Sequence, residues 1–494
     1  MDEKRNQWWD SNFFYYWFCG HVFTAVLGFF QYGYCIGVIN APQQIIMMHY
    51  AKVLNIETAK NTTGSFLIEE VVKDPTIMML WSLSVSMFAV GGMISSFTVG
   101  WIGEKMSRVR AMLLVNIFAV SGNIFFVVAK SGPSHILVII GRVLTGLHGG
   151  LSSGLAPLYV GEIAPTALRG ALGTLNQLAV VIGILISQVL GLDILFGTSK
   201  TWPLLLSLSG GAAVLQIFLL LICPESPRYM YIKCGDVEGA QKSKKTSSNC
   251  LKIMLKNAGH GLLGEEELNL DEDRNIFDSN YICSSGLNGE TLNIFYYSTD
   301  IFNKAHVRKP IYATIGVGFV NTVFTVVALF LVEKAGRRIL FMAGLLGMMV
   351  CTITMTLGLV LQPNIEWMSY VSLVSVFLFV SFFEIGPGPI PWFIVAELFS
   401  QGPRPAAVAI AGFSNWVTNF CIGMFFPYLA KLLGAYVFLV FAGLLVLFVL
   451  FIYLKVPETK GKSFEEIAEE FRRRSKKGLG GPTEMEHLGA NQEA

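Results

Sequence analysis

Several uncharged polar side chains and indoles lie inside long apolar runs of this sequence. They are Gln177, Gln188, Asn321, Asn415, Asn419, Trp392 and Trp416. An amide both donates and accepts hydrogen bonds, and an indole adds an aromatic face. Glu384 is the one carboxylate in the middle of an apolar run of the second half. Together these groups favour a polar cavity that could bind an uncharged ligand with several hydroxyl groups.

The composition indicates what must position these side chains. Of the 494 residues, 53% are hydrophobic and only 14% are charged, and the mean hydropathy is positive. This balance is too apolar for a soluble protein of this length and predicts an all-α membrane protein. The net charge is only +2, so neither a nucleic acid nor an acidic partner is expected. The eight cysteines show no paired spacing, so no structural disulfide is expected.

Apolar runs predict where the chain crosses the lipid, because a helix needs about 20 apolar residues to do so. The first half contains such runs at 17–39, 77–99, 111–129, 136–158, 171–192 and 202–222. The second half contains them at 312–332, 339–361, 370–394, 406–430 and 434–455. We therefore expect an N-terminal bundle of six helices over residues 1–222.

Lys and Arg gather in every second connection, which marks the cytoplasmic side. The basic groups lie at 4–5, 105–110, 169, 233–256, 334–338, 404 and 455–477. Both termini are therefore expected in the cytoplasm of a multi-pass membrane protein. The connection at 40–76 lies on the opposite side and contains Asn61-Thr62-Thr63, an acceptor pattern for N-glycosylation at Asn61.

This alternation requires one more crossing before residue 312. The best candidate is 281–302, which contains Glu290 and Asp300 and little aliphatic content. Its insertion should be marginal, so the seventh helix is expected to be weak or defective. The expected organisation continues with a cytoplasmic linker and an aberrant start of helix 7 at 223–293, a C-terminal bundle at 294–456 and a cytoplasmic tail at 457–494.

Three charged signatures occur twice, in the same order, at the edges of apolar runs. They pair Glu104, Lys105 and Arg108 with Glu333, Lys334 and Arg337, then Pro157, Glu162 and Arg169 with Pro391, Glu397 and Arg404, and finally 224–227 with 457–459. Arg108 and Arg337 are 229 positions apart, Arg169 and Arg404 are 235 apart, and the third pair is 233 apart. Three ordered pairs at nearly one offset indicate a duplicated membrane transporter.

Longer motifs surround these signatures. They are Gly141-Arg142 with Gly146 and Gly150, YVGEIAPTALRG at 159–170, PESPR at 224–228, EKAGRR at 333–338, GPGPIPW at 386–392 and PETKG at 457–461. With these motifs the chain resembles the facilitative glucose transporters, the sugar-porter branch of the major facilitator superfamily, over nearly its whole length. The resemblance implies a major facilitator fold of two six-helix bundles, with a sugar site between them near the middle of the bilayer.

The resemblance also implies which residues bind a hexose. They are Gln177, Asn321, Glu384, Trp392, Asn415 and Trp416, with Asn288 as a further candidate. A hexose presents hydroxyls around a ring with two apolar faces, which suits amides and indoles. A single amide in a membrane helix can instead form an interhelical hydrogen bond, and we favour this interpretation for Gln188 and Asn419. For Trp392, packing is an alternative to gating.

Two further groups predict moving parts. Pro387, Pro389 and Pro391 remove three backbone donors within five residues, so the tenth helix should break there. Such a break favours a gate, although a static kink is also consistent with it. Charged residues at the cytoplasmic ends could form a latch that closes the inner side, although they also serve the positive-inside rule. The latch residues are Arg108, Glu162, Arg169, Glu333, Arg337, Arg338, Glu397 and Arg404.

One arginine also lies inside an apolar run. The resemblance implies that Arg142 matters for transport, and its expected partner is either sugar or neighbouring carbonyls. His148, which lies in the same run, is expected to pack and not to function in transport.

The sequence favours passive transport. It has no Gly-rich phosphate loop, so ATP hydrolysis is not expected. Related proton-linked sugar symporters carry a carboxylate after Gly-Tyr in the first helix, whereas Cys35 follows Gly33-Tyr34 here. We therefore expect uniport of a hexose, with D-glucose preferred, across the plasma membrane. No enzymatic activity, cofactor or metal site is expected, and the oligomeric state stays open. A proton-coupled symporter is an alternative.

The family pattern is broken in the seventh helix. The family carries paired glutamines there, but Ile282 and Cys283 replace them, and ETLN at 290–293 is inserted before the retained FYYST segment. A further alternative is therefore a transport-impaired splice or gene-model variant that acts at most as a sugar-binding or interacting membrane protein.

Overall fold

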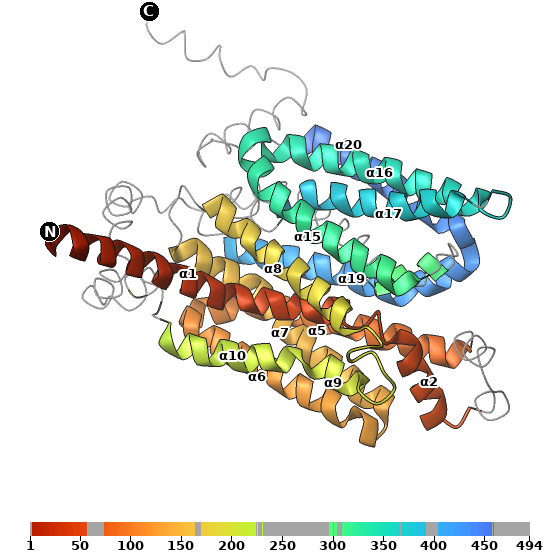
Figure 1. Ribbon diagram of the computed structural model, residues 1–494, viewed down its shortest axis with the longest axis horizontal. Helices are drawn as coiled ribbons and strands as arrows, with labels where there is room; N and C mark the ends of the chain where they lie inside the picture. Colours follow the sequence, from red (N-terminus) through yellow and green to blue (C-terminus); the bar gives the residue numbers. More distant parts are fainter. Residues whose placement is uncertain are drawn as a thin grey trace, which may run out of the picture.

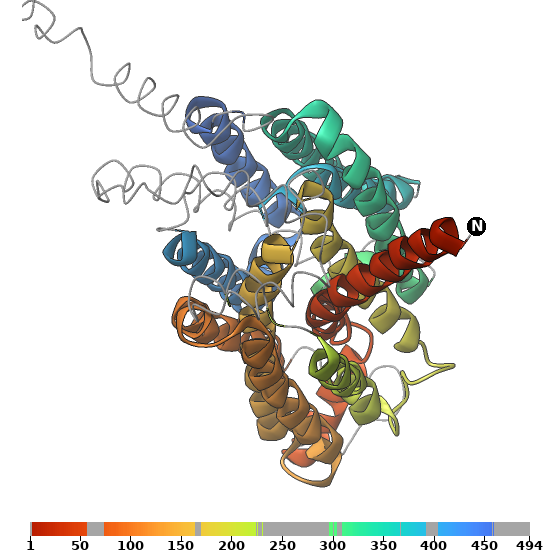
Figure 2. The same cartoon turned by 90° about the vertical axis from the view of Figure 1, so that its left-hand side faces the viewer.

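The structure is a computed structural model. It describes residues 2–56, 74–163, 169–223, 225, 230, 296–299, 301–303, 309–365, 367–391, 404–456 and 458. Over these residues the chain forms long helices that run side by side along a common direction (Figure 1). Seen along that direction, the helices before residue 223 and those after residue 309 occupy two neighbouring groups (Figure 2).

The first group contains the six apolar runs of the first half. Its helices are α1 (Asp2–Gly37), α5 (Pro75–Lys105), α6 (Arg108–Val128), α7 (Ser134–Ile163), α8 (Arg169–Leu190) and the consecutive α9 (Trp202–Ser207) and α10 (Ser209–Ile222). A short 3-10 turn, η1 (Ala129–Ser131), follows α6. Helix α1 begins well before residue 17, where its apolar run starts, so the polar N-terminal residues extend the helix and do not form a separate tail.

The second group contains the five runs of the second half. Its helices are α15 (Pro310–Ala335), α16 (Arg337–Leu361), α17 (Met368–Ile385), α19 (Arg404–Leu433) and α20 (Val437–Lys455), the last two joined by the 3-10 turn η3 (Gly434–Tyr436). Residues 296–299 and 301–303 are also helical. The rest of the crossing predicted at 281–302 lies outside the described residues. The predicted weakness of helix 7 is therefore not confirmed.

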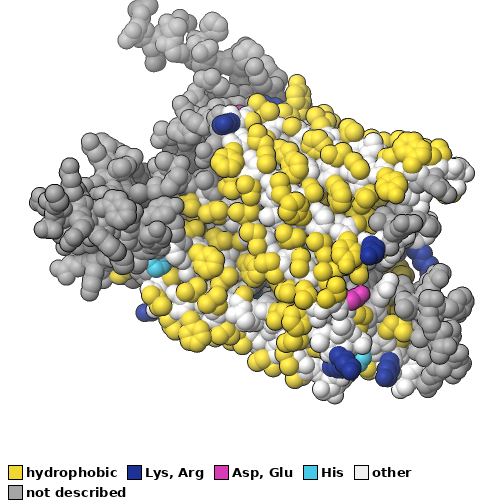
Figure 3. Space-filling view, viewed as in Figure 1, with side chains coloured by type: hydrophobic (Ala, Val, Ile, Leu, Met, Phe, Trp, Pro, Cys, Tyr) yellow, Lys and Arg dark blue, Asp and Glu magenta, His cyan; other side chains and the backbone are white. Residues whose placement is uncertain are grey.

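The described helices are those of a multi-pass membrane protein. Among these residues, nine segments are long and apolar enough to cross a membrane, and one of them, Ala409–Leu454, covers α19 and α20 together. Apolar side chains cover the middle of the face in Figure 3, whereas Lys and Arg lie toward its edges. This distribution is expected for helices surrounded by lipid.

The connection at 40–76 contains a helix that the apolar runs did not predict. This helix, α2 (Gln43–Val53), has only 11 residues. It is held by its contacts: the hydroxyl of Tyr50 lies 3.1 Å from the Ser84 hydroxyl of α5, and the His49 ring lies 5.5 Å from the Trp202 ring of α9. Helix α5 then begins at Pro75, where the Asp74 side chain accepts hydrogen bonds from two backbone N–H groups.

Candidate functional site

Two contacts join the first half to the second along the middle of the molecule. In one, α8 of the first half packs against α15 and hydrogen-bonds to α17 of the second, and we call this contact the polar seam. In the other, α5 of the first half packs against α19 of the second, and we call it the apolar seam. The described sugar-binding candidates lie on the helices of these two seams: Gln177, Asn321 and Glu384 in the polar seam, and Asn415 and Trp416 on α19 of the apolar seam.

The polar seam is centred on a hydrogen-bonded junction between the halves. Gln177 on α8 donates from Nε2 to both carboxylate oxygens of Glu384 on α17, at 3.0 and 3.4 Å. The hydroxyl of Thr325 on α15 donates to Oε2 of Glu384 at 2.9 Å and also contacts the Asn321 carbonyl. Three helices from both halves therefore share one buried carboxylate. Thr325 was not predicted from the sequence, although it is one helical turn from Asn321 and on the same face.

Within the described part of the chain, amide atoms of one residue on α15 and one on α19 are buried and unpaired. Asn321 is fully buried, and neither its Nδ2 nor its Oδ1 has a hydrogen-bond partner in the part of the chain that the structure describes. The Oδ1 of Asn415 on α19 is also buried without a hydrogen-bond partner among the described residues. Buried polar atoms are paired in most proteins, so each exception needs an explanation. A ligand with hydroxyl groups could pair with these atoms.

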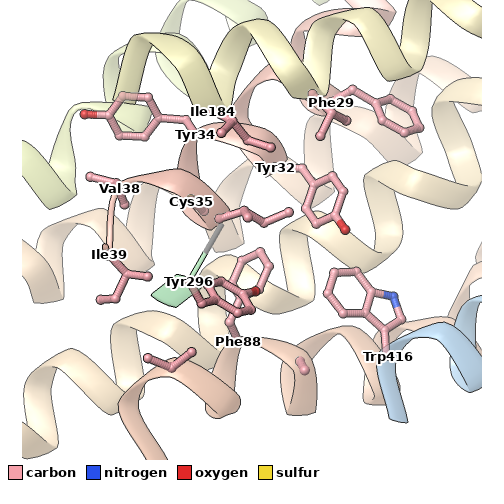
Figure 4. Packing of buried hydrophobic residues seen from close by; sticks show 14 of the residues in the cluster. Phe29, Tyr32, Tyr34, Cys35, Val38, Ile39, Phe88, Ile184, Tyr296 and Trp416 are labelled. Atoms are coloured by element: carbon pink, nitrogen blue, oxygen red, sulfur yellow. The ribbon is translucent and has the colours of Figure 1, made fainter. Parts of the chain in front are cut away.

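The apolar seam is built around Trp416 of α19, which enters the first half (Figure 4). Its ring lies 5.5 Å from that of Tyr32 on α1 and 5.6 Å from that of Phe88 on α5, both edge to face. A Cβ placed on Gly92 would lie 2.1 Å from Trp416, so only glycine leaves room for the indole. Farther along this seam, the rings of Phe97 and Phe413 lie 4.6 Å apart.

Arg142 on α7 is buried in the first half and contacts backbone carbonyls. Its Nε, Nη1 and Nη2 donate to the carbonyls of Ser84, Cys35 and Val85, respectively. The guanidinium also lies over the Phe88 ring, 4.5 Å from its centroid. The sequence left either sugar or neighbouring carbonyls as the partner of Arg142, and in this structure the guanidinium donates to carbonyls. His148 is buried on the same helix, with Nε2 3.2 Å from the Ser152 hydroxyl.

Among the described residues, Gln188 and Asn419 do not form the interhelical hydrogen bonds that were favoured for them. Both side chains are buried, and within the described ranges neither amide has a partner for its nitrogen or its oxygen. The sequence-based interpretation is therefore wrong for both. Gln188 lies on α8 in the polar seam, with its Oε1 toward Gly318 of α15.

Where α1 ends and α15 begins, the polar seam is closed by a chain of hydrogen bonds between the halves. We call this the outer end, after the orientation predicted from the basic connections. Asn40, just after α1, donates from Nδ2 to the Ser298 hydroxyl at 2.8 Å. Ser298 lies 3.1 Å from the hydroxyl of Thr314 on α15, which also lies 3.3 Å from the Thr299 hydroxyl. These four residues were not predicted, because an isolated Ser, Thr or Asn at a helix end has many structural roles.

At the other end of the molecule, the two halves contain the same contact. Glu225 of the PESPR motif accepts a hydrogen bond from the Val109 N–H at the start of α6, at 3.1 Å. Glu458 of the PETKG motif accepts from the N–H groups of Arg337 and Arg338 at the start of α16, at 2.8 and 3.1 Å. An acidic side chain at a helix N-terminus is favourable in both places. Since α6 and α16 follow matching signatures, this contact repeats with the sequence duplication.

The latch residues are only partly described. Arg108 lies at the start of α6, and Arg337 and Arg338 lie at the start of α16. The Arg338 Nη2 donates to the Tyr453 carbonyl of α20 at 2.6 Å, so this side chain is held within its own half. The side chains of Glu162, Arg169, Glu333 and Arg404 lie outside the described residues, as do Asn61, Asn288, Trp392 and Glu397.

The proline-rich segment follows α17 directly. This helix ends at Ile385, and residues 386–389 form a turn before the chain is helical again at 390–391. Pro387, Pro389 and Pro391 are all buried. The turn starts two residues after Glu384, so the backbone irregularity follows the shared carboxylate of the polar seam almost directly.

The arrangement described so far is that of a membrane transporter with a polar site between two helical bundles. A protein-family model described as sugar (and other) transporter matches residues 21–471. The facilitated glucose transporter member 2 of solute carrier family 2 from Gallus gallus is 56% identical over 518 aligned positions, with 96% of each chain covered. Member 4 from Homo sapiens is 50% identical over 497 positions, with 95% of this chain and 94% of that relative covered. The chain belongs to the sugar transporter family.

Solved structures agree on the fold. The major facilitator superfamily proton:xylose symporter XylE, bound to 6-bromo-6-deoxy-D-glucose, matches with a TM-score of 0.75 at 23% identity, over 92% of this chain and 99% of that chain. The inward open conformation of XylE from E. coli matches with a TM-score of 0.71 over the same shares. The predicted major facilitator fold is confirmed.

Proposed function

We propose that this protein is a facilitative hexose transporter that carries D-glucose down its gradient by alternating access. The observation that carries the proposal is the junction of Gln177, Glu384 and Thr325 beside the unpaired amide of Asn321. A buried polar atom without a partner costs about 1–3 kcal/mol. Sugar hydroxyls would remove that cost, and they would do so at a place where both halves contribute side chains.

The named relatives support both the substrate and the passive mechanism. Members 2 and 4 of solute carrier family 2 are called facilitated glucose transporters. Neither the proton-coupled alternative nor the transport-impaired alternative gains support from these relatives. We accordingly assign a transport function and no enzymatic reaction, with no use of ATP.

The remaining expectations form part of the same proposal. The bundles at 1–222 and 294–456 would rock against each other, with the linker at 223–293 and the tail at 457–494 in the cytoplasm of a plasma-membrane protein. Trp392, Asn415, Trp416 and Asn288 would complete the sugar path. The arginines and acids of the latch would close the inner side, and Asn61 would carry a glycan outside.

The test is uptake of labelled D-glucose by the purified protein in liposomes, with L-glucose and protein-free liposomes as controls. We expect D-glucose to equilibrate and not to accumulate, with or without an inward proton gradient. Accumulation above equilibrium under that gradient would establish a symporter instead. Absence of uptake, while a variant with Ile282→Gln and Cys283→Gln transports, would establish the impaired form.

A further inference from the structure

Gln188 occupies the same face of α8 as Gln177, farther along the polar seam. The two residues are 11 positions apart, which is close to three full helical turns and about 16 Å along the helix axis. On α15, Thr314, Gly318, Asn321 and Thr325 also share one face, because they recur at spacings of three and four. Polar groups therefore continue from the central junction toward the outer end of the seam.

The amide of Gln188 is buried in this structure, in which the outer end is closed, and it forms no hydrogen bond with the described residues. The side chain is only 2% exposed, and neither its Nε2 nor its Oε1 has a partner among the residues that the structure describes. Its Oε1 faces the backbone of Gly318, where a Cβ would lie 2.3 Å away. A leucine would fill similar space without an unpaired donor and acceptor. Packing alone therefore does not explain an amide here.

The surroundings of Gln188 indicate when its amide would find a partner. Helix α8 packs tightly on the end of α1, where a Cβ on Gly37 would lie 2.3 Å from the Ser187 hydroxyl and a Cβ on Gly191 would lie 2.5 Å from Ala41. Asn40 lies between Gly37 and Ala41 in the chain and donates a hydrogen bond to Ser298 of the other half. Separation of the halves at this end would break that bond and open the space beside Gln188.

We propose that Gln188 is a second sugar-contacting amide, which binds a ring hydroxyl in the outward-facing state before the sugar reaches Gln177. Thr314, one turn from Gly318, would present its hydroxyl to the same space once its contact with Ser298 is broken. An amide and a hydroxyl can together donate to and accept from one sugar hydroxyl. The inference rests on the proposed hexose transport and adds an outer binding station to it.

The test is a set of double-mutant cycles between protein and sugar. Entry of labelled D-glucose into cells is competed by external D-glucose and by its 2-, 3-, 4- and 6-deoxy analogues, for the natural protein and for Gln188→Leu. Because Gln188→Leu removes one or two hydrogen bonds to the sugar, the apparent affinity for external D-glucose should fall about five- to tenfold. The deoxy analogue that lacks the hydroxyl bound by Gln188 has no such bond to lose, so its apparent affinity should fall much less than that of D-glucose.

Gln216 provides the matched control. This buried amide lies within the first half, where it accepts from Gln31 at 2.7 Å and donates to the Thr24 carbonyl at 2.9 Å. Gln216→Leu should lower stability without a preference among the analogues. If Gln188→Leu fails to reach the membrane, Gln188→Asn, which keeps a shortened amide, goes through the same cycle.

Equal weakening of every analogue by the Gln188 variant, or no weakening at all, would overturn the outer station. A parallel cycle with Gln177→Leu separates this failure from a failure of the proposed function. If Gln177 couples to a hydroxyl and Gln188 does not, only the outer station is wrong. If the natural protein takes up no hexose, the proposed function and the outer station both fall.

Discussion

The two seams that join the halves have opposite chemistry. In the apolar seam, Trp416 of α19 fills a space beside Gly92 of α5 and contacts two further aromatic rings. In the polar seam, Gln177, Glu384 and Thr325 meet in one hydrogen-bonded group. One seam depends on shape and the other on pairing of donors and acceptors. Two bundles that rock against each other need both kinds of contact, one to keep them together and one that a ligand can replace.

Packing in lipid is non-directional, whereas hydrogen bonds are specific. Helices in a bilayer associate by close van der Waals packing, which small residues such as Gly92 allow. Such a contact can hold the halves together while they change angle. Hydrogen bonds in the polar seam can be exchanged for bonds to a sugar, because hydroxyls offer the same donors and acceptors. We therefore expect sugar to act mainly on the polar seam, and on the apolar seam only at Trp416, which we propose lines the sugar path.

The largest effect should follow removal of the indole in the apolar seam. Trp416→Ala would leave a large cavity between α19, α5 and α1, at a cost of about 3–5 kcal/mol in stability. Trp416→Phe should recover much of this loss. The measurement is the melting temperature of the protein in detergent, with and without D-glucose.

The same experiment tests whether Trp416 is purely structural or also contacts sugar. A purely structural Trp416 predicts that the Ala variant melts earlier while the stabilisation by added D-glucose is retained in size. If the melting temperature without sugar is unchanged and only the stabilisation by sugar disappears, Trp416 contacts the ligand and the apolar seam is part of the binding site.

The next largest effect concerns the shared carboxylate. Glu384→Leu would leave Gln177 and Thr325 without their acceptor, and a buried donor left without a partner costs about 1–3 kcal/mol. D-glucose uptake should fall about 10- to 100-fold. Glu384→Gln keeps one acceptor oxygen, so its D-glucose uptake should fall less. Uptake in liposomes at matched protein content measures both variants, and equal activity of all three proteins would exclude a role for this junction.

The positions of the crossings could be predicted because hydropathy sums over many residues. Runs such as 77–99 and 339–361 match α5 and α16 closely, since a membrane helix is defined by about 20 residues of composition. Helix α2 could not be found in this way. It has 11 residues with a mixed pattern, and its position depends on contacts of Tyr50 and His49 with α5 and α9.

Partners of single polar residues were less predictable than positions. Gln188 was expected to bond to another helix, but the residue that faces it is Gly318, which has no side chain. Arg142 could have paired with sugar, but carbonyls from α1 and α5 surround it. Both outcomes depend on the rotation and height of one helix against another. A pattern within one helix does not contain that information.

A smaller effect should come from the outer part of the polar seam. Gly318→Ala would place a methyl group 2.3 Å from the Oε1 of Gln188 and 3.3 Å from Leu185, so one of them must move. Because the Oε1 is the end of a flexible side chain that can turn away, the cost should lie at the lower end of the range for overpacking, about 1 kcal/mol. The double variant Gly318→Ala with Gln188→Ala should melt later than Gly318→Ala alone, because the side chain that meets the new methyl is gone. Melting temperatures of the two single variants and the double variant complete this cycle.

The smallest effect should be found at the aromatic pair of the apolar seam. Phe97 and Phe413 lie 4.6 Å apart, and Phe97 is 66% exposed at the surface of the helices. Aromatic pairs contribute about 0.5–1.5 kcal/mol beyond their buried area. A cycle of Phe97→Leu, Phe413→Leu and the double variant should give a coupling in that range from melting temperatures. Because this pair holds the halves by packing, its coupling should be the same with and without D-glucose. A coupling that vanishes when sugar is added would mean that α5 and α19 separate on binding, and the apolar seam would then move as much as the polar one.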